Sequence, residues 1–154
     1  MKMFIMKQII LSIFCLTAFT TLFEGCKKDN SKTNPVNVPS LSGTWEIRQA
    51  QTKNIPTINY PAGNGNLLKF TETSYSTYTN GSIIKSGQYS LANDNTAGTN
   101  VCLVLPDNEY RNRIIFDTDY TSAKTFVQVT NDTAKFISGC FAVDSGYYYV
   151  YIRQ

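Results

Sequence analysis

Residues 42–48 read Ser-Gly-Thr-Trp-Glu-Ile-Arg, and the alternation within this stretch decides the fold class. Two apolar side chains, Trp45 and Ile47, alternate with polar side chains at 44, 46 and 48. A period of two is the pattern of a β-strand that buries one face and exposes the other. The stretch therefore predicts a half-buried strand at the start of a β-rich domain.

Outward from this strand, similar patterns recur to the end of the chain. We expect further short strands, each bounded by polar or turn residues, at 67–71, 75–79, 82–85 with a continuation at 87–91, 101–105, 113–116, 125–130, 134–140 and 147–153. Asn80-Gly81 is the strongest hairpin signal in the chain, and Asn131-Asp132 predicts a second tight turn. No window shows a helical period over a useful length.

These eight or nine strands follow one another in up-and-down order, and such a meander must close or stack to hide its edges. We predict an all-β fold, a small antiparallel up-and-down β-barrel over residues 41–154, with a two-sheet sandwich as the alternative. The stretch 53–66 contains two prolines and two glycines and predicts a long loop. Loops of this length often form lids or binding edges.

The start of the chain predicts a targeting signal and not a part of the barrel. Lys2 and Lys7 accompany a mostly apolar run at 9–23. That run is shorter than the roughly 20 residues of a membrane span and fits the helix of a secretory signal. We expect residues 1–25 to be a lipoprotein signal peptide.

Cys26 stands directly after Gly25, and a cysteine behind a small residue is the pattern of bacterial lipoproteins. We expect acyl chains on Cys26 to hold the protein at a membrane, with residues 26–40 as the lipidated cysteine and a flexible tether. The expected location is the cell envelope, at the outer membrane, with either the periplasmic or the cell-surface face left open.

The charge of the chain is unevenly distributed. The net charge of +3 lies entirely in residues 1–40, because residues 41–154 contain equal numbers of basic and acidic side chains. A neutral domain gives no reason to expect a nucleic-acid partner.

The chain contains no histidine, which excludes Ser-His-Asp and Cys-His nucleophiles and imidazole metal ligands. It also lacks a CxxC pair and a glycine-rich phosphate loop. Two pairs of carboxylates, Asp107 with Glu109 and Asp117 with Asp119, stand where the chain is expected to turn, and we interpret them as solvated turn residues. We expect no enzyme activity, no cofactor and no metal site.

Cys102 and Cys140 are the two cysteines of the expected barrel, and both fall in expected strands. An envelope location permits their oxidation to a disulfide. The alternative is a pair of buried free thiols, since strand positions can be bridged only when the Cα atoms lie within about 7 Å.

An ordered set of short motifs runs through the domain, namely Gly43-x-Trp45, Leu68-x-Phe70, Gly87-x-Tyr89-x-Leu91 and Tyr149-x-Tyr151-x-Arg153. With the lipid signal, this set resembles the bacterial lipocalin-like lipoproteins over residues 41–154. The resemblance implies a lipocalin-type barrel in which Trp45 closes one end and stacks with Arg153 in a cation–π contact.

Aromatic side chains are abundant in the domain, and tyrosines combine a flat apolar ring with a polar hydroxyl. We expect a membrane-anchored binding module for a small apolar or amphipathic ligand. The candidate ligand-binding residues are Tyr60, Tyr75, Tyr89, Leu91 and Tyr149. The alternative is an accessory lipoprotein with a filled barrel, which binds a protein partner, of unknown identity, through its outer face or loops.

Overall fold

The computed structural model describes residues 40–52 and 54–154, which belong to the compact unit Pro35–Gln154. The signal peptide predicted at 1–25, the lipidation of Cys26 and nearly all of the tether at 26–40 lie outside the described residues. They remain predictions.

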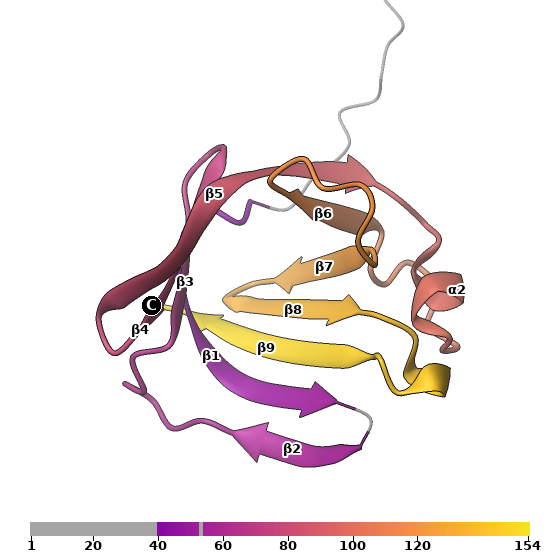
Figure 1. Ribbon diagram of the computed structural model, residues 1–154, viewed down its shortest axis with the longest axis horizontal. Coiled ribbons are helices and arrows are strands. Elements are labelled where there is room, and N and C mark those ends of the chain that lie inside the picture. The colour runs from indigo at the N-terminus through magenta and orange to yellow at the C-terminus, as the bar shows by residue number, and fades with distance from the viewer. Residues whose placement is uncertain (1–39, 53) are drawn as a thin grey trace, which may run out of the picture. The chain divides into compact units, whose positions relative to one another are not determined.

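The described residues form a closed antiparallel β-barrel (Figure 1). Its strands are β1 (Gly43–Thr52), β2 (Ile55–Asn59), β3 (Leu67–Phe70), β4 (Ser74–Thr79), β5 (Ser82–Asn93), β6 (Asn112–Phe116), β7 (Thr125–Thr130), β8 (Thr133–Ser138) and β9 (Tyr147–Arg153). β1 pairs with β3, each of β3 to β8 pairs with the next strand in sequence, and β9 returns to pair with β1. Eight strands therefore close the barrel and β2 is an extra strand, so the predicted all-β barrel of eight or nine strands is confirmed.

The predicted loop at 53–66 is wrong in part, because it contains β2. β2 and β3 both pair with β1, and the pairing runs on between them: Tyr60 N–H donates to the Arg48 carbonyl at 2.9 Å, and Ile47 N–H donates to the Asn66 carbonyl at 3.1 Å. β2 and β3 thus act as one long partner of β1, interrupted by an insertion at 61–65. The sequence pattern did not predict β2, because Pro56 lies within it and proline disfavours a strand. The other proline and the two glycines of the predicted loop belong to the insertion at 61–65.

The hairpin predicted at Asn80-Gly81 is confirmed, with φ angles of 51° and 80° at these two residues. Such positive angles suit asparagine and glycine and match the twist of a two-residue hairpin. The strand predicted at 82–85 and its continuation at 87–91 form the single strand β5.

The strand predicted at 101–105 is wrong. The segment begins with the last residue of a short helix, α2 (Ala97–Val101), and Cys102 ends that helix in the left-handed conformation at φ 57°. A short apolar run does not by itself distinguish a buried strand from a buried helix end. Here Val101, 0% exposed, is buried from α2. A second short helix, η1 (Phe141–Val143), joins β8 to β9.

Two hydrophobic clusters stabilise the described residues. The first contains buried side chains of the barrel strands, including Trp45, Phe70, Val127 and Phe136. The second contains Ala97, Val101, Tyr110, Phe126 and Ile137. Neighbouring residues of a strand point to opposite faces, so Phe126 lies opposite Val127 and Ile137 opposite Phe136. The first cluster is therefore inside the barrel, and the second lies outside it under α2.

Candidate ligand-binding site

Two adjoining pockets open along the inner face of the barrel. We call the first the inner pocket; it has a volume of about 410 Å³ and is lined by Leu68, Tyr75, Thr77, Lys85, Phe116, Thr125, Phe136, Tyr147, Tyr149 and Tyr151. These residues come from seven consecutive strands, β3 to β9, and β6 contributes its last residue, Phe116. The register places the side chains on one face, because Leu68, Thr77 and Lys85 are directly paired across β3, β4 and β5.

The second pocket, which we call the outer pocket, has a volume of about 550 Å³. It lies between β2 and the β4–β5 hairpin, with Ile55, Ile58 and Tyr60 on one side and Tyr78 and Ile84 on the other. Thr77, Tyr149 and Tyr151 line both pockets. The two volumes therefore share a wall and form one candidate site.

A row of three tyrosines on β9 lines the inner pocket, and two of them, Tyr149 and Tyr151, also belong to the shared wall. The ring centroids of Tyr147 and Tyr149 are 5.2 Å apart, and those of Tyr149 and Tyr151 are 6.4 Å apart. Burial raises the pKa of both the Tyr149 and the Tyr151 hydroxyl, so both stay protonated at neutral pH. A protonated hydroxyl both donates and accepts a hydrogen bond, so the wall offers flat apolar rings with polar tips.

Lys85 is the one charged side chain among the described residues that line either pocket. Its Nζ lies 3.3 Å from Asp117 Oδ2 and 5.6 Å from the centroid of the Tyr75 ring. The Tyr75 hydroxyl donates to the same Asp117 oxygen at 2.8 Å. That hydrogen bond, with the nearby ammonium, lowers the pKa of Asp117, and the hydrogen bond with Tyr75 raises the pKa of Lys85.

Gly87 makes room for this charged group. A Cβ atom at Gly87 would collide with Asp117 Oδ1, which also accepts a hydrogen bond from the Gln88 N–H at 3.1 Å. The glycine in the Gly87-x-Tyr89 motif is thus explained by the approach of a carboxylate from the end of β6.

Three of the five candidate ligand-binding residues line a pocket, and two do not. Tyr75 and Tyr149 line the inner pocket, and Tyr60 and Tyr149 line the outer pocket. Tyr89 and Leu91 line neither of these pockets and pack against the first cluster instead. Tyr89 meets Phe70 edge to face at 4.8 Å, and its hydroxyl donates to the Thr71 carbonyl.

Sequence reasoning missed several lining residues, namely Ile55, Ile58, Thr77, Ile84 and Lys85. A signal was present for two of them. Thr77 alternates with Tyr75 in β4, and Lys85 alternates with Gly87 and Tyr89 once β5 is understood as one strand. The isoleucines of β2 carry no such signal, because Pro56 between them and the prolines and glycines that follow predict a loop.

The insertion at 61–65 is held against the outer face of β1 by the carboxylate of Glu46. Although charged, Glu46 is only 2% exposed. It accepts hydrogen bonds from Gly63 N–H at 3.1 Å and Gly65 N–H at 3.4 Å, and pairs with Arg48 at 3.0 Å. Gly63 and Gly65 have φ angles of 72° and 75°, which other residues rarely adopt.

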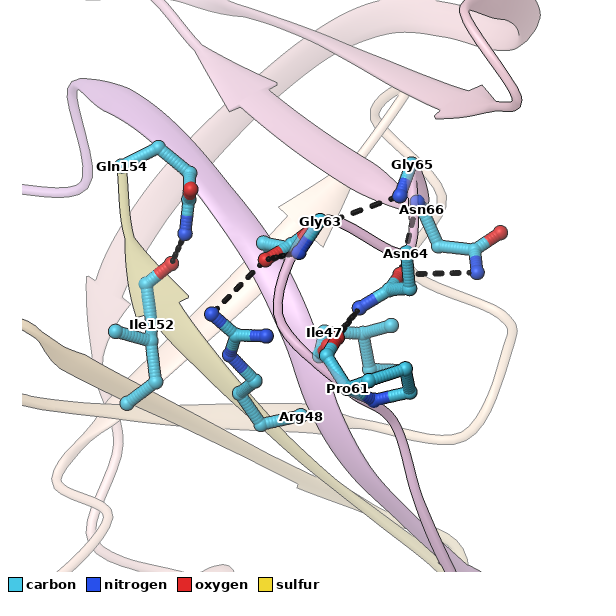
Figure 2. Close-up of polar contacts among 10 residues, drawn as sticks. Ile47, Arg48, Pro61, Gly63, Asn64, Gly65, Asn66, Ile152 and Gln154 are labelled. Carbon is cyan, nitrogen blue, oxygen red and sulfur yellow. Dashed lines mark hydrogen bonds and ion pairs between the residues drawn. The ribbon is translucent and has the colours of Figure 1, made fainter.

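Asn64 completes this attachment, as Figure 2 shows. Its side-chain amide donates to the carbonyl oxygens of Ile47 and Pro61 at 2.8 and 2.7 Å, and its oxygen accepts from Asn66 N–H at 2.9 Å. Both ends of the insertion are therefore fixed, and the start of β3 is fixed with them.

Trp45 and Arg153 lie together at the end of the barrel away from the outer pocket. The two residues are directly paired between β1 and β9, and the Arg153 guanidinium carbon is 4.1 Å from the Trp45 ring centroid. Trp45 is fully buried, and its Nε1–H donates to the Leu41 carbonyl at 2.7 Å.

Cys102 and Cys140 form a disulfide with their Cα atoms 5.0 Å apart. Neither cysteine lies in a strand, in contrast to the prediction. Cys102 ends α2 and Cys140 precedes η1, so the bond joins two connections beside the second cluster.

The paired carboxylates lie in connecting segments. Asp119 accepts hydrogen bonds from Thr121 N–H at 2.8 Å and from the Ser122 hydroxyl, and these bonds lower its pKa. Asp107 and Glu109 belong to one turn, in which the Glu109 N–H donates to the Pro106 carbonyl at 3.2 Å. Among the described residues, no group of three or more His, Cys, Asp or Glu side chains is placed to hold a metal ion.

The fold and the site define an all-β antiparallel barrel with an aromatic-walled pocket. Comparison of the chain with protein-family models, with curated proteins and with solved structures found no match. The resemblance to lipocalin-like lipoproteins therefore remains a prediction based on the motifs. Within the described part of the chain, no helix has the length and apolar character to cross a membrane.

Proposed function

We propose that this protein binds a small apolar or amphipathic molecule across the inner and outer pockets. The observation that carries the proposal is the shared wall of Thr77, Tyr149 and Tyr151 between pockets of about 410 and 550 Å³. Ligand sites of drug-sized molecules are typically about 300–1,000 Å³, mostly apolar, with a few polar groups that fix orientation. Tyrosine hydroxyls and the Lys85 ammonium are the polar groups here.

These pockets favour ligand binding over the alternative of a filled barrel that only binds a protein partner. We propose a binding role and not a catalytic one, because the chain lacks histidine. Of the paired carboxylates, Asp107 and Glu109 lie in a turn, Asp119 is hydrogen-bonded within its own turn, and Asp117 is paired with Lys85. We further propose that lipidation of Cys26 holds the barrel at the outer membrane. Palmitate labelling of the chain in cells, lost in Cys26→Ala, tests the anchor; labelling that survives the substitution would contradict it.

The binding proposal is tested with the purified full chain. Native mass spectrometry looks for a co-purified molecule, and a fluorescent fatty-acid probe reports binding in solution. Thr77→Phe places a ring in the wall common to both pockets and should abolish probe binding. Thr130→Phe, at an exposed position of β7, is the matched control and should bind as the unaltered protein does.

A protein that carries no molecule and shifts no probe would end the binding proposal. Equal probe binding by the Thr77→Phe and Thr130→Phe variants would place the probe elsewhere and would also contradict it. Circular dichroism of both variants confirms that the barrel is folded in each case.

A further inference from the structure

Four exposed isoleucines surround the outer pocket, and we call them the isoleucine rim. Ile55 and Ile58 of β2 are 55% and 46% exposed, and Ile83 and Ile84 at the start of β5 are 59% and 66% exposed. Ile55, Ile58 and Ile84 line the pocket itself. Ile83 pairs directly with Tyr78, which also lines it. Single exposed apolar residues are common, but four on the strands that border one opening are the pattern of an interaction surface.

The rim carries the residue types of a surface that enters a lipid interface. Tyr60 and Tyr78 stand beside the isoleucines in the same pocket wall. Tyrosines, with an apolar ring and a polar hydroxyl, are enriched where membrane and water meet. The remaining pocket residues of this region are uncharged, including Asn66 and Thr79.

The strands that carry and border the rim contain no acidic residue. β2, β4 and β5 together contain one charged residue, Lys85 of β5, whose Nζ lies 3.3 Å from Asp117 Oδ2. These strands therefore place no carboxylate of their own where anionic lipid headgroups would be repelled.

We propose that the isoleucine rim docks the barrel onto the headgroup region of a lipid bilayer, so that the outer pocket opens toward the membrane. Insertion buries isoleucine surface in the acyl boundary, while tyrosine hydroxyls stay at headgroup level. The proposal goes beyond ligand binding, because it assigns a surface and an orientation and needs no ligand in the pocket. It is also independent of acylation at Cys26.

The test places a tryptophan in the rim of the full chain and measures its contact with lipid. Ile84→Trp reports from the rim, and Val104→Trp, at a fully exposed apolar position beyond α2, is the matched control. Trp45 is 0% exposed and supplies the same shielded background in every variant. Each variant is mixed with vesicles of equal parts phosphatidylcholine and phosphatidylglycerol, with and without brominated acyl chains, which quench tryptophan on contact.

We expect the emission of the Ile84→Trp variant to shift to shorter wavelength on vesicles and to be quenched by the brominated lipid. The Val104→Trp variant should show neither change. Because any lipid anchor is common to both variants, anchoring alone cannot produce this difference. Ile58→Trp provides a second rim reporter if Ile84→Trp does not fold.

Absence of quenching at both rim positions would overturn the proposal, and so would equal quenching at position 104. A blue shift without bromine quenching, accompanied by a doubled sedimentation mass, would overturn it in favour of a second copy of the chain on the rim. Rim quenching in a protein that binds no fatty-acid probe would support docking while contradicting the binding proposal, so the two can fail separately.

Discussion

The guanidinium of Arg153, one residue from the end of the chain, lies 4.1 Å from the centre of the Trp45 ring in the first strand. Its Nη1 donates to the Ser42 carbonyl at 2.6 Å, and its Nε lies 3.5 Å from Asp132 Oδ1. A Cβ at Gly43 would be 2.6 Å from the same Nη1. The Gly-x-Trp motif thus has a local physical reason: the glycine leaves room for the arginine that covers the tryptophan.

Arg153→Ala should lower the free energy of unfolding by about 1–3 kcal/mol, because it removes the cation–π contact and a charge-assisted hydrogen bond at the join of β1 and β9. Arg153→Lys should lose less, since it keeps the charge without the planar fork. Urea denaturation measures both. Arg111→Ala, at an exposed position, is the control. An Arg153→Ala variant as stable as the Arg111→Ala control would contradict this role.

Gly87→Ala should destabilise the barrel by about 1–3 kcal/mol, because the new methyl group meets the Asp117 carboxylate. In an Asp117→Ala background the same change should cost much less, since the colliding oxygen is gone. A double-mutant cycle of urea midpoints measures the coupling. Additive effects of the two substitutions would show that the carboxylate is not what excludes a side chain at 87.

Glu46→Gln should loosen the insertion at 61–65. The variant loses the ion pair with Arg48 and replaces a carboxylate acceptor of two glycine amides, so we expect about 1–3 kcal/mol of destabilisation. Hydrogen exchange at Gly63 and Gly65 should quicken. Glu72→Gln, at an exposed turn position, should leave exchange and stability unchanged. Unaltered protection of both glycine amides in Glu46→Gln would refute the assignment.

Removing the disulfide with Cys102→Ser and Cys140→Ser together should cost about 3–4 kcal/mol, from the chain-entropy estimate for a sequence separation of 38. Fatty-acid probe binding should persist at temperatures where the variant is folded, because the bond lies beside the second cluster and outside the barrel. Thermal unfolding and probe titration measure the two effects. Loss of probe binding in a folded variant would show that the pockets depend on the disulfide beside the second cluster, and would contradict the prediction.

The pKa of Asp119 is lowered from its ordinary value of 3.8 by hydrogen bonds from Ser122 and Thr121. A folded-state pKa below the unfolded value means that this carboxylate stabilises the fold fully above about pH 4, and that the contribution is lost as pH falls through the folded pKa. Ser122→Ala should therefore flatten the acid side of the stability curve, measured by urea unfolding between neutral and acidic pH. An unchanged curve would contradict the prediction.

Much of the fold follows from local pattern. Alternation predicted the last strand, Tyr147–Arg153, and the strand Thr125–Thr130 with the bounds that the structure gives them. Asn80-Gly81 predicted its hairpin, because few other pairs adopt two positive φ angles. These predictions are correct for the same reason. Strand alternation and turn preference depend on residues that are adjacent in the sequence, so the sequence alone shows them.

The elements that were predicted wrongly depend on residues that are distant in the sequence. β2 forms a strand because it pairs with the edge of β1, although Pro56 lowers the strand propensity of the segment. Residues 97–105 form a helix and a loop in which Ala97 and Val101 pack against Phe126 of β7 and Ile137 of β8. No local sequence pattern indicates that the outer faces of these two strands are covered. In the same way, Lys85 becomes a pocket residue only when β5 continues through it.

The sequence by itself determined an alternating, tyrosine-rich chain without histidine, whose short strands must close into a barrel or stack as a sandwich to hide their edges. Only the tertiary structure decided which tyrosines line a pocket and which only pack against the first cluster. Tyr89 and Tyr149 have the same local pattern, yet one packs against Phe70 and the other faces two pockets. The difference arises from strand register and barrel closure, which bring distant residues together and have no local signature.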